Sequence, residues 1–362
     1  MMTRTAQIAQ YGGPEVIEWI DVDVAPPGPG EVQMRNIAVG LNFIDTYHRR
    51  GIYPVTLPSG LGLEAAGIVE ALGDGVTAFK IGQRVCTFGP AMGAYTTLRK
   101  LPATTLFATP DDISDDIAAA ALLKGCTTEF LVERCAKVQA GQAVLVHAAA
   151  GGVGLLLVQW LKHVGATVIG TVSTEEKAAL ARAAGADHII LYGQEDVAKT
   201  VREITGGAGV RVTFDGVGMA TWEASLDSTG RRGLIVNYGN ADAPVGGVNL
   251  GILAQKGSLY NTRPTLFDYY ADPVERSTGA DRVFDMIRRG IIAVTIGQTY
   301  ALEDAAQAHT ISKGAKQQVQ PCCGPRRAYF AVALARWPSI IRLNTVQVVS
   351  LGRVSSPGGG AV

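Results

Sequence analysis

Three glycines close together, Gly151, Gly152 and Gly154, form the strongest chemical signal in this chain. They follow an apolar, β-branched run at 143–148 and precede an apolar segment of helical length. Such a strand, tight turn and helix lets the backbone approach a ligand closely, and the helix start offers N–H groups to a phosphate. The spacing Ala149-x-Gly151-x-x-Gly154 is that of a dinucleotide fingerprint with Ala in place of the first Gly. A small-residue turn between any strand and helix is the alternative.

Ser173 and Lys177 follow the next strand-like run, 167–172. At this point a site for NAD uses Asp or Glu to accept a hydrogen bond from the ribose 2′-OH. A hydroxyl, a helix start and a lysine suit a 2′-phosphate instead, and therefore NADPH. Glu175 and Glu176 are also close, and we interpret them as first-turn helix acids that face solvent. A solvated helix lysine is the alternative for Lys177.

Polar and aromatic residues also gather near the start of a short predicted helix at 42–48, which Asn42 is placed to cap. Hydride transfer needs a protein to align the reactants, exclude water and donate hydrogen bonds to the developing oxyanion. Asn42, Tyr47 and Tyr53 are candidates to line and polarise such a site, and we expect Asp45 to orient the neighbouring loop. Each tyrosine could instead pack its ring in the core.

The histidines and serines do not suggest covalent catalysis. His147 lies inside a predicted buried strand, where we expect a hydrogen-bonded core histidine. His48 has no clear chemical role, and no nucleophile–base–acid triad is visible. The chemistry predicted here therefore depends on a cofactor rather than on an activated side chain.

The elements that must position these residues alternate between strand and helix from about residue 125 to 262. Their helices commonly end on glycine, as C-caps should. This order predicts a doubly wound parallel sheet with right-handed crossovers, the Rossmann arrangement. The predicted strands are 143–148, 167–172, 188–191, 210–215 and 233–238, and the predicted helices are 152–164, 174–184, 195–204 and 219–226.

The residues around this region predict a second unit. Short strand-like runs separated by residues typical of turns occupy residues 3 to about 100, and helices are expected at 114–122 and 126–137. After the parallel sheet we expect three helical segments, a strand at 293–300 and a helix at 303–311. The fold class is therefore α/β, with a β-rich domain beside the dinucleotide domain.

Composition excludes several classes of function. The chain has 362 residues with 32 basic and 32 acidic side chains, so no net field favours nucleic acid or an anionic membrane. No apolar run reaches membrane-spanning length. Five scattered cysteines contain no C-x-x-C pair, which indicates a reduced compartment, here taken as the cytoplasm, with no disulfide framework.

Five short motifs stand along the chain: Asn42-Phe43-Ile44-Asp45-Thr46-Tyr47, Gly51-Ile52-Tyr53-Pro54, Gly62-Leu63-Glu64-Ala65-Ala66-Gly67, Ala148-Ala149-Ala150-Gly151-Gly152-Val153-Gly154 and Gly257-Ser258-Leu259-Tyr260-Asn261-Thr262-Arg263-Pro264. Together they resemble the medium-chain dehydrogenase/reductase superfamily, and more closely its zinc-free quinone oxidoreductase branch, the zeta-crystallin-like NADPH:quinone reductases. The resemblance spans about residues 3–312. It implies a GroES-like catalytic domain with a Rossmann domain inserted.

The resemblance also implies the contacts of NADPH. Thr127 would lie near the nicotinamide ribose, Tyr192 over the 2′-phosphate, and Arg263 beside the nicotinamide and the substrate. The implied catalytic residues are Asn42, Tyr47, Tyr53 and Arg263. The implied cofactor-binding residues are Asn42, Asp45, Thr127, Gly151, Gly152, Val153, Gly154, Ser173, Lys177, Tyr192, Val217, Tyr238, Gly239, Asn240 and Arg263.

The residues argue against zinc. A catalytic zinc needs Cys, His and a third ligand, and the Gly-His-Glu motif of the zinc-dependent relatives reads Gly62-Leu63-Glu64 here. Their first cysteine would fall near Asn42, and their structural cysteines near residues 90–110, which hold none. We therefore predict no metal. Glu64 alone could suggest a carboxylate site, but we expect a buried structural residue or a hydrogen bond to the backbone.

Three functions are compatible with the sequence. The first is NADPH-dependent reduction of quinones by hydride or electron transfer. The second is reduction of an enone or 2-alkenal with the same cofactor, and the third is an NADPH-binding structural or RNA-associated crystallin-like role. The expected partners are a small quinone or enone and a second copy of the chain, with no nucleic acid and no membrane. The homodimer would form through the sheet edge near 257–262.

We predict domain boundaries at 1–124 for the GroES-like domain, 125–262 for the Rossmann domain and 263–314 for the return. Residues 315–362 depart from the family pattern. The family closes with a short strand on the catalytic domain, which the sequence does not reveal. The prediction for 315–362 is therefore a poorly ordered tail that leaves a sheet edge uncovered.

Overall fold

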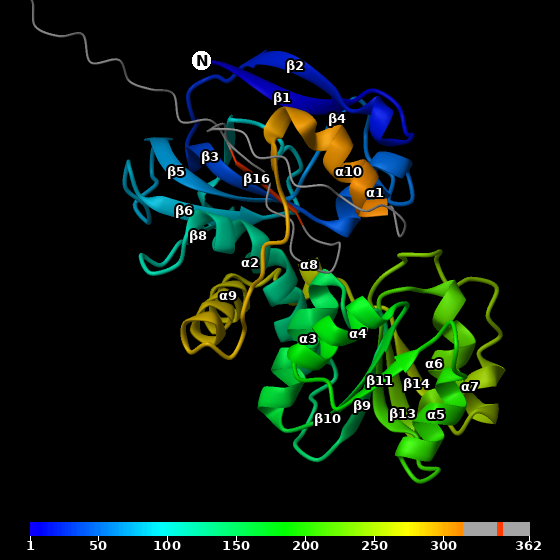
Figure 1. Ribbon diagram of the computed structural model, residues 1–362. Helices are drawn as coiled ribbons and strands as arrows, with labels where there is room; N and C mark the ends of the chain where they lie inside the picture. Colours follow the sequence, from blue (N-terminus) through cyan, green and yellow to red (C-terminus); the bar gives the residue numbers. More distant parts are fainter. Residues whose placement is uncertain (314–338, 343–362) are drawn as a thin grey trace, which may run out of the picture.

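The computed structural model describes residues 1–313 and 339–342, which form two lobes (Figure 1). The first lobe contains a seven-stranded sheet in the order β15-β16-β3-β5-β6-β8, with β7 also paired to β3, and a small sheet in the order β2-β1-β4. The second contains a six-stranded sheet in the order β11-β10-β9-β12-β13-β14. The predicted fold class, a GroES-like domain beside a Rossmann domain, is confirmed.

The seven-stranded sheet is antiparallel except where β15 and β16 pair in parallel. Its core contains Val32, Met34 and Val39 from β3, which are fully buried with Tyr95. The strands of this lobe are β1 Met2–Ile8, β2 Glu18–Asp23, β3 Glu31–Leu41, β4 Ser59–Gly60, β5 Glu64–Leu72, β6 Arg84–Phe88, β7 Leu98–Pro102, β8 Leu106–Ala108, β15 Thr299–Ala301 and β16 Ser339–Arg342. The helices beside it are α1 Phe43–Arg50 and α10 Ala305–Lys313.

The six-stranded sheet is parallel throughout and buried on both faces. On its central strand, Val144 and Val146 pack with the core beneath α3 and α4, whereas Leu145 packs with Val201 of α5 on the other face. This alternation explains why the strand is a continuous apolar run. The strands are β9 Ala143–Val146, β10 Thr167–Val172, β11 His188–Leu191, β12 Val210–Asp215, β13 Thr229–Asn237 and β14 Tyr260–Thr262. The helices are α3 Gly152–Val164, α4 Glu175–Ala183, α5 Val197–Ile204, α6 Trp222–Ser228 and α7 Gly251–Gln255.

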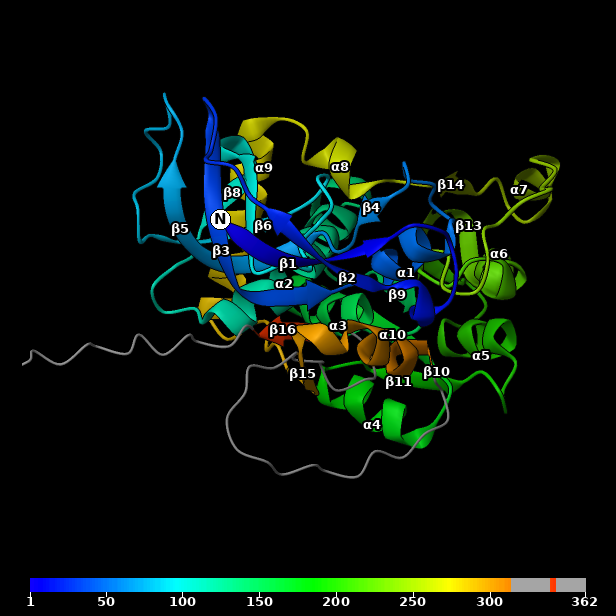
Figure 2. The ribbon, with the colours of Figure 1, turned by 90° about the horizontal axis from the view of Figure 1, so that it is seen from above.

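Three further helices lie at the junction of the lobes. α2 Asp115–Glu129 is capped by Ser114, whose side chain accepts the N–H of Ile117, and it continues into a π-helical turn, Phe130–Cys135. The two separate helices predicted at 114–122 and 126–137 are therefore one continuous element. α8 Leu266–Tyr269 and α9 Pro273–Arg288 follow the return of the chain. Figure 2 shows α5, α6 and α7 at the end of the molecule opposite β5 and β8.

The expectation that the closing strand is missing is wrong. β16 pairs antiparallel with β3, from Ser339 opposite Leu41 to Arg342 opposite Ala38, and it covers that edge of the sheet. The backbone groups of β3 find partners there, although the sequence around 339–342 has lost the family pattern. Residues 314–338 and 343–362, on which the rest of the tail prediction falls, lie outside the described part of the chain.

Candidate active site

A cavity of about 560 Å³ opens between the two lobes. The first lobe and α2 provide one wall of this cavity, and the carboxyl ends of the parallel strands provide the other. That is where ligands bind in open α/β sheets. The lining residues are Asn42, Phe43, Ile44, Tyr47, Tyr53, Leu123, Lys124, Thr127, Phe130, Ala148, Gly151, Gly152, Val153, Gly154, Gly216, Tyr238, Gly239, Asn240, Ala241, Arg263, Pro264, Thr265, Leu266 and Phe267.

The glycine turn lies at the base of the cavity, as its spacing predicts. Gly151 is the N-cap of α3, so the first N–H groups of a 13-residue helix face the cavity without partners inside the helix. A Cβ at Gly154 would collide with the carbonyl oxygen of Ala148. The turn therefore needs glycine at that position and offers an anion site to a phosphate.

Ala149 replaces the first glycine of the fingerprint and packs against a glycine of the next strand. Its side chain is fully buried and faces Gly170 of β10, where an added Cβ would lie 2.7 Å from the Cβ of Ala149. The glycine at position 170 thus makes room for the alanine at position 149. The pair preserves the close packing that the fingerprint normally achieves with its own glycine.

The residues predicted for the 2′-phosphate lie together at the end of β10. Nζ of Lys177 donates to Oγ of Ser173 at 2.8 Å, and the N–H of Tyr192 donates to the carbonyl of Val172 at 3.2 Å. None of these residues lines the cavity itself. Glu175 is exposed and pairs with Arg182 at 3.2 Å, as expected for a first-turn acid facing solvent. The assignment of Ser173, Lys177 and Tyr192 to a phosphate stays a prediction.

Hydroxyl groups from α1 and the following loop cross to the dinucleotide lobe. The hydroxyl of Tyr47 accepts the backbone N–H of Asn240 at 3.0 Å, and that of Tyr53 accepts from Nη2 of Arg263 at 2.7 Å. The Asn240 amide also lies 3.0 Å from the Tyr53 hydroxyl, and Nη1 of Arg263 donates to the carbonyl of Asn237 at 3.1 Å. The structure therefore brings Tyr47, Tyr53, Asn240 and Arg263 into one wall of the cavity.

Asn42 lines the cavity, and its amide is held from behind. Nδ2 of Asn42 donates to Oε2 of Glu64 at 2.8 Å, and the other oxygen of Glu64 accepts the backbone N–H of Leu123 at 2.7 Å. Glu64 is fully buried and Leu63 is 1% exposed. The expectation that Glu64 is a buried residue hydrogen-bonded to the backbone is confirmed.

Asp45 is fully buried beneath Asn42 and does not line the cavity. Its Oδ2 accepts the Asn42 backbone N–H at 2.8 Å and the Tyr95 hydroxyl at 3.0 Å. Burial raises the pKa of Asp45 to about 7, against the lowering effect of these two hydrogen bonds. The arrangement fits the expected role of orienting the loop around Asn42.

A polar chain continues from Asp45 to α10. The Tyr95 hydroxyl lies 3.0 Å from Nε2 of His309, whose Nδ1 lies 2.7 Å from Nη1 of Arg49. Because arginine can only donate, Nδ1 of His309 accepts and Nε2 carries the proton that it donates to Tyr95. All four side chains are nine-tenths or more buried. The sequence did not predict this chain, because its members lie up to 264 positions apart.

The remaining predicted residues are divided between the cavity and the strands behind it. Thr127 lines the cavity, and its hydroxyl donates to the Leu123 carbonyl at 2.7 Å. Val217 lies outside the cavity lining, and its N–H donates to Oδ1 of Asp215 at 2.8 Å. His147 is buried and its Nδ1 lies 3.0 Å from the Thr171 hydroxyl, as expected of a core histidine, but its Nε2 has no hydrogen-bond partner among the described residues.

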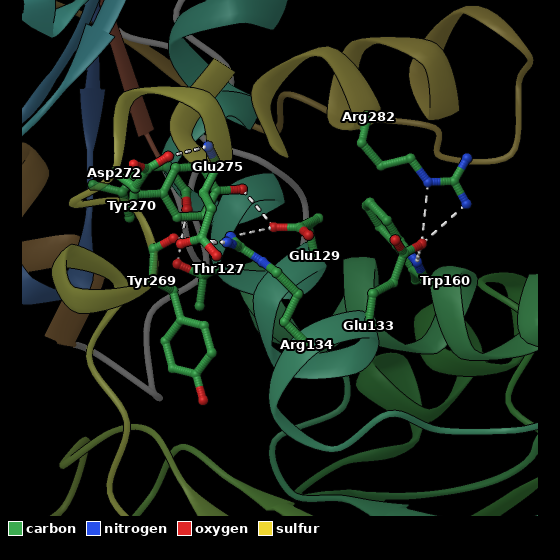
Figure 3. Close-up of polar contacts among 11 residues, drawn as sticks. Thr127, Glu129, Glu133, Arg134, Trp160, Tyr269, Tyr270, Asp272, Glu275 and Arg282 are labelled. Atoms are coloured by element: carbon green, nitrogen blue, oxygen red, sulfur yellow. Dashed lines mark hydrogen bonds and ion pairs between the residues drawn. The ribbon is translucent and has the colours of Figure 1, made fainter. Parts of the chain in front are cut away.

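The wall formed by α2 and the return segment is fixed by a second polar cluster (Figure 3). Glu129 accepts from the Tyr270 hydroxyl at 2.6 Å and from Nη2 of Arg134 at 2.8 Å. Nη1 of Arg134 donates to the Tyr269 carbonyl at 2.7 Å, and the Tyr269 ring stacks on Phe130 at 4.5 Å. Phe130 is thereby held as an apolar surface of the cavity, together with Phe267.

Sequence reasoning missed Lys124 in the cavity. Its Nζ lies 3.3 Å from Oε2 of Glu64, and its side chain is 5% exposed. A lone lysine inside the apolar run 117–126 was the available signal.

Within residues 1–313 and 339–342 no group of three or more His, Cys, Asp and Glu could hold a metal ion, and no helix is long and apolar enough to cross a bilayer.

Comparisons with known proteins agree with this architecture. A family model described as zinc-binding dehydrogenase matches residues 152–263, and one described as alcohol dehydrogenase GroES-like domain matches residues 28–111. A quinone oxidoreductase of Pseudomonas aeruginosa is 52% identical over 310 residues, covering 85% of this chain and 95% of its own. A 2-haloacrylate reductase of a Burkholderia species is 45% identical over 320 residues, covering 86% and 96%.

A solved structure shares the whole arrangement. The quinone oxidoreductase of Escherichia coli, crystallised with NADPH, superposes with a TM-score of 0.84 at 46% identity, covering 86% of this chain and 96% of its own. The likeness extends over both lobes.

Proposed function

Because the chain belongs to the quinone oxidoreductase family of the medium-chain dehydrogenases, we propose that it reduces quinones with NADPH and without a metal. The observation that carries this proposal is the cavity between the lobes. In it the N-terminus of α3 lies at the base, and a wall of Tyr47, Tyr53, Asn240 and Arg263 faces apolar surface from Phe130 and Phe267.

The residues present fit NADPH. The helix start and the glycine turn suit its pyrophosphate, and the Lys177–Ser173 pair suits its 2′-phosphate. When bound, the cofactor supplies a hydride. This chain's own residues orient the two reactants between the lobes, exclude water and donate hydrogen bonds to the acceptor.

The apolar rings suit a flat, uncharged acceptor. Tyr47 can still donate its hydroxyl proton in a hydrogen bond, because the Asn240 N–H uses only a lone pair of its oxygen. Burial raises the pKa of Tyr47, so the hydroxyl stays neutral and acts as a hydrogen-bond donor. Asn42 adds an amide held by Glu64.

An assay of NADPH oxidation with a series of benzoquinones and naphthoquinones tests the proposal. We expect turnover with quinones, and weaker turnover with NADH than with NADPH. Absence of turnover with every quinone, with NADPH binding intact, would refute it.

Reduction of an activated alkene is the second candidate. It is supported by the 45% identity with a 2-haloacrylate reductase, which covers 96% of that protein. The same cavity would hold the alkene and the same wall would face its electron-withdrawing group. The assay therefore includes 2-chloroacrylate and an enone, and a kcat/KM higher than for any quinone would favour this alternative.

The homodimer is also a proposal. β14 is the edge strand of the parallel sheet, and Tyr260 on this strand is 59% exposed. An open edge with an exposed aromatic side chain can pair with the same edge of a second copy. Analytical ultracentrifugation at micromolar concentration tests this, and a sedimentation coefficient of a monomer would contradict it.

A reduced, cytoplasmic location is supported by the free thiols of Cys86, Cys126 and Cys135.

A further inference from the structure

Lys124 is an unusual residue for the interior of a protein. Its charge lies in the middle of α2, which is buried around it, and only 5% of its side chain is exposed. Burying an ammonium group costs free energy even when it is paired. Glu64 does not require it for hydrogen bonding, because Leu123 and Asn42 already donate to the two carboxylate oxygens at 2.7 and 2.8 Å. The lysine makes the longest of the three contacts, at 3.3 Å.

Lys124 stands out among the ionisable side chains that line the cavity. Within the described residues its lining contains no His, Asp or Glu, and its ionisable members are Lys124, Arg263 and three tyrosines. Arginine keeps its proton in proteins. Burial raises the pKa of Tyr47 and of Tyr238, so neither releases a proton readily. The Tyr53 hydroxyl accepts from Nη2 of Arg263 at 2.7 Å, and its own proton is engaged by the side-chain oxygen of Asn240 at 3.0 Å.

Lys124 also has access to a second cavity. A space of about 190 Å³ lies between α2, α3, α4 and the segment before β15, and Lys124 and Gly152 line both cavities. Gln159 and Thr295 provide polar side chains on its wall. Such a space is large enough to hold water.

We propose that Lys124 is the catalytic acid of this enzyme and protonates the reduced acceptor. The proposal rests on the proposed function, which supplies the hydride from NADPH. After hydride transfer the quinone is an oxyanion; one Nζ–H bond of Lys124 breaks, an O–H bond forms on the acceptor, and the lysine is left as a neutral amine. A proton taken up from bulk solvent and relayed through the second cavity returns to Nζ and restores the ammonium, so the overall reaction consumes one proton from solvent.

The charged groups around Lys124 tune this step in a defined direction. Burial lowers the pKa of Lys124, and Glu64 on β5 and Asp45 on α1 raise it. Asn42, also in contact with Glu64, carries no charge. An acid with a lowered pKa gives up its proton more readily, while the nearby Glu64 favours the ammonium form of Lys124.

The first experiment replaces Lys124 by Met and by Arg. Both side chains fill the space but cannot donate a proton, and Arg keeps the charge. We expect kcat with a quinone to fall on the order of 100-fold or more in both variants, with NADPH affinity by fluorescence titration unchanged. Lys100→Met is the matched control, since Lys100 also pairs with a glutamate, at 2.9 Å, but lies outside the cavity. Full kcat in Lys124→Arg would overturn the proposal.

The second experiment reads the proton directly. In the wild-type enzyme kcat should fall at alkaline pH as Lys124 loses its proton, with a solvent deuterium isotope effect above one. Glu64→Gln should move this alkaline limb to lower pH, because the carboxylate that raises the pKa of Lys124 is gone. The wild-type measurements test the role of Lys124 as catalytic acid even if every Lys124 variant fails to fold. A kcat without an alkaline limb and without a solvent isotope effect would overturn that role. A wild-type enzyme without turnover would instead refute the proposed function.

Discussion

The hydroxyl of Tyr47 accepts the backbone N–H of Asn240 across 3.0 Å, and this bond joins α1 of the first lobe to the loop after β13 of the second. Asn240 is 6% exposed, so its N–H has little access to water. The same tyrosine ring meets the Tyr53 ring edge-on at 5.0 Å. The residue is therefore both a wall of the cavity and a link between the lobes.

Replacing Tyr47 by Phe should leave the Asn240 N–H without this acceptor. A buried donor left unpaired costs about 1–3 kcal/mol, so the free energy of unfolding should fall by that amount. We also expect a lower kcat/KM, because the cavity loses a hydrogen-bond donor. Urea unfolding and steady-state kinetics measure the two effects. Tyr11→Phe is the control: its hydroxyl bonds Val55 at an exposed site, and its activity should be unchanged.

Replacing Lys177 by Ala should weaken NADPH selectively. Loss of a charged hydrogen bond to the 2′-phosphate costs about 1.5–3 kcal/mol, or roughly 10- to 150-fold in the dissociation constant. NADH has no such phosphate, so its affinity should hardly change. Lys199→Ala is the control, because Lys199 is exposed on α5. Equal losses for both cofactors in a fluorescence titration would rule out the phosphate assignment.

Asp45 should make the protein less stable as pH rises. Its pKa is about 7 when folded and near 3.8 when unfolded, so between these values the folded state holds the extra proton. The free energy of unfolding contributed by this group is therefore present below about pH 4 and is lost as pH rises through about 7. Asp45→Asn imitates the protonated form and should remove this dependence. Unfolding curves for both proteins from pH 4 to 8 give the difference in their free energies of unfolding at each pH. A difference that stays the same across this range would contradict the prediction.

The strand β16 should contribute to stability. Ending the chain after residue 338 removes the antiparallel partner of β3 between Ala38 and Leu41, and ending it after residue 342 retains that partner. We expect a lower Tm for the shorter chain because an edge of β3 loses its backbone hydrogen bonds. Scanning calorimetry compares the two chains, which differ by four residues. Equal Tm values would show that the pairing adds nothing to stability.

The sequence by itself determined the parallel sheet and the base of the site. The alternation of apolar strands with helices ending on glycine indicates a doubly wound sheet, because local periodicity reports which faces are buried. Gly151 and Gly154 identify the turn at α3, since only small residues allow the backbone to bend so closely. Leu63 argues against a zinc ligand at that position from its chemistry alone.

Only the tertiary structure decided how residues distant in the chain meet. Lys124 and Glu64 are 60 positions apart, and Arg49 and His309 are 260 apart, so no local pattern could pair them. The closing strand was missed for the same reason. Four residues, Ser339–Arg342, are too short to show a period, and what makes them a strand is the unpaired edge of β3. Local sequence specifies which backbone conformations are favoured, whereas hydrogen bonding between distant segments selects their partners.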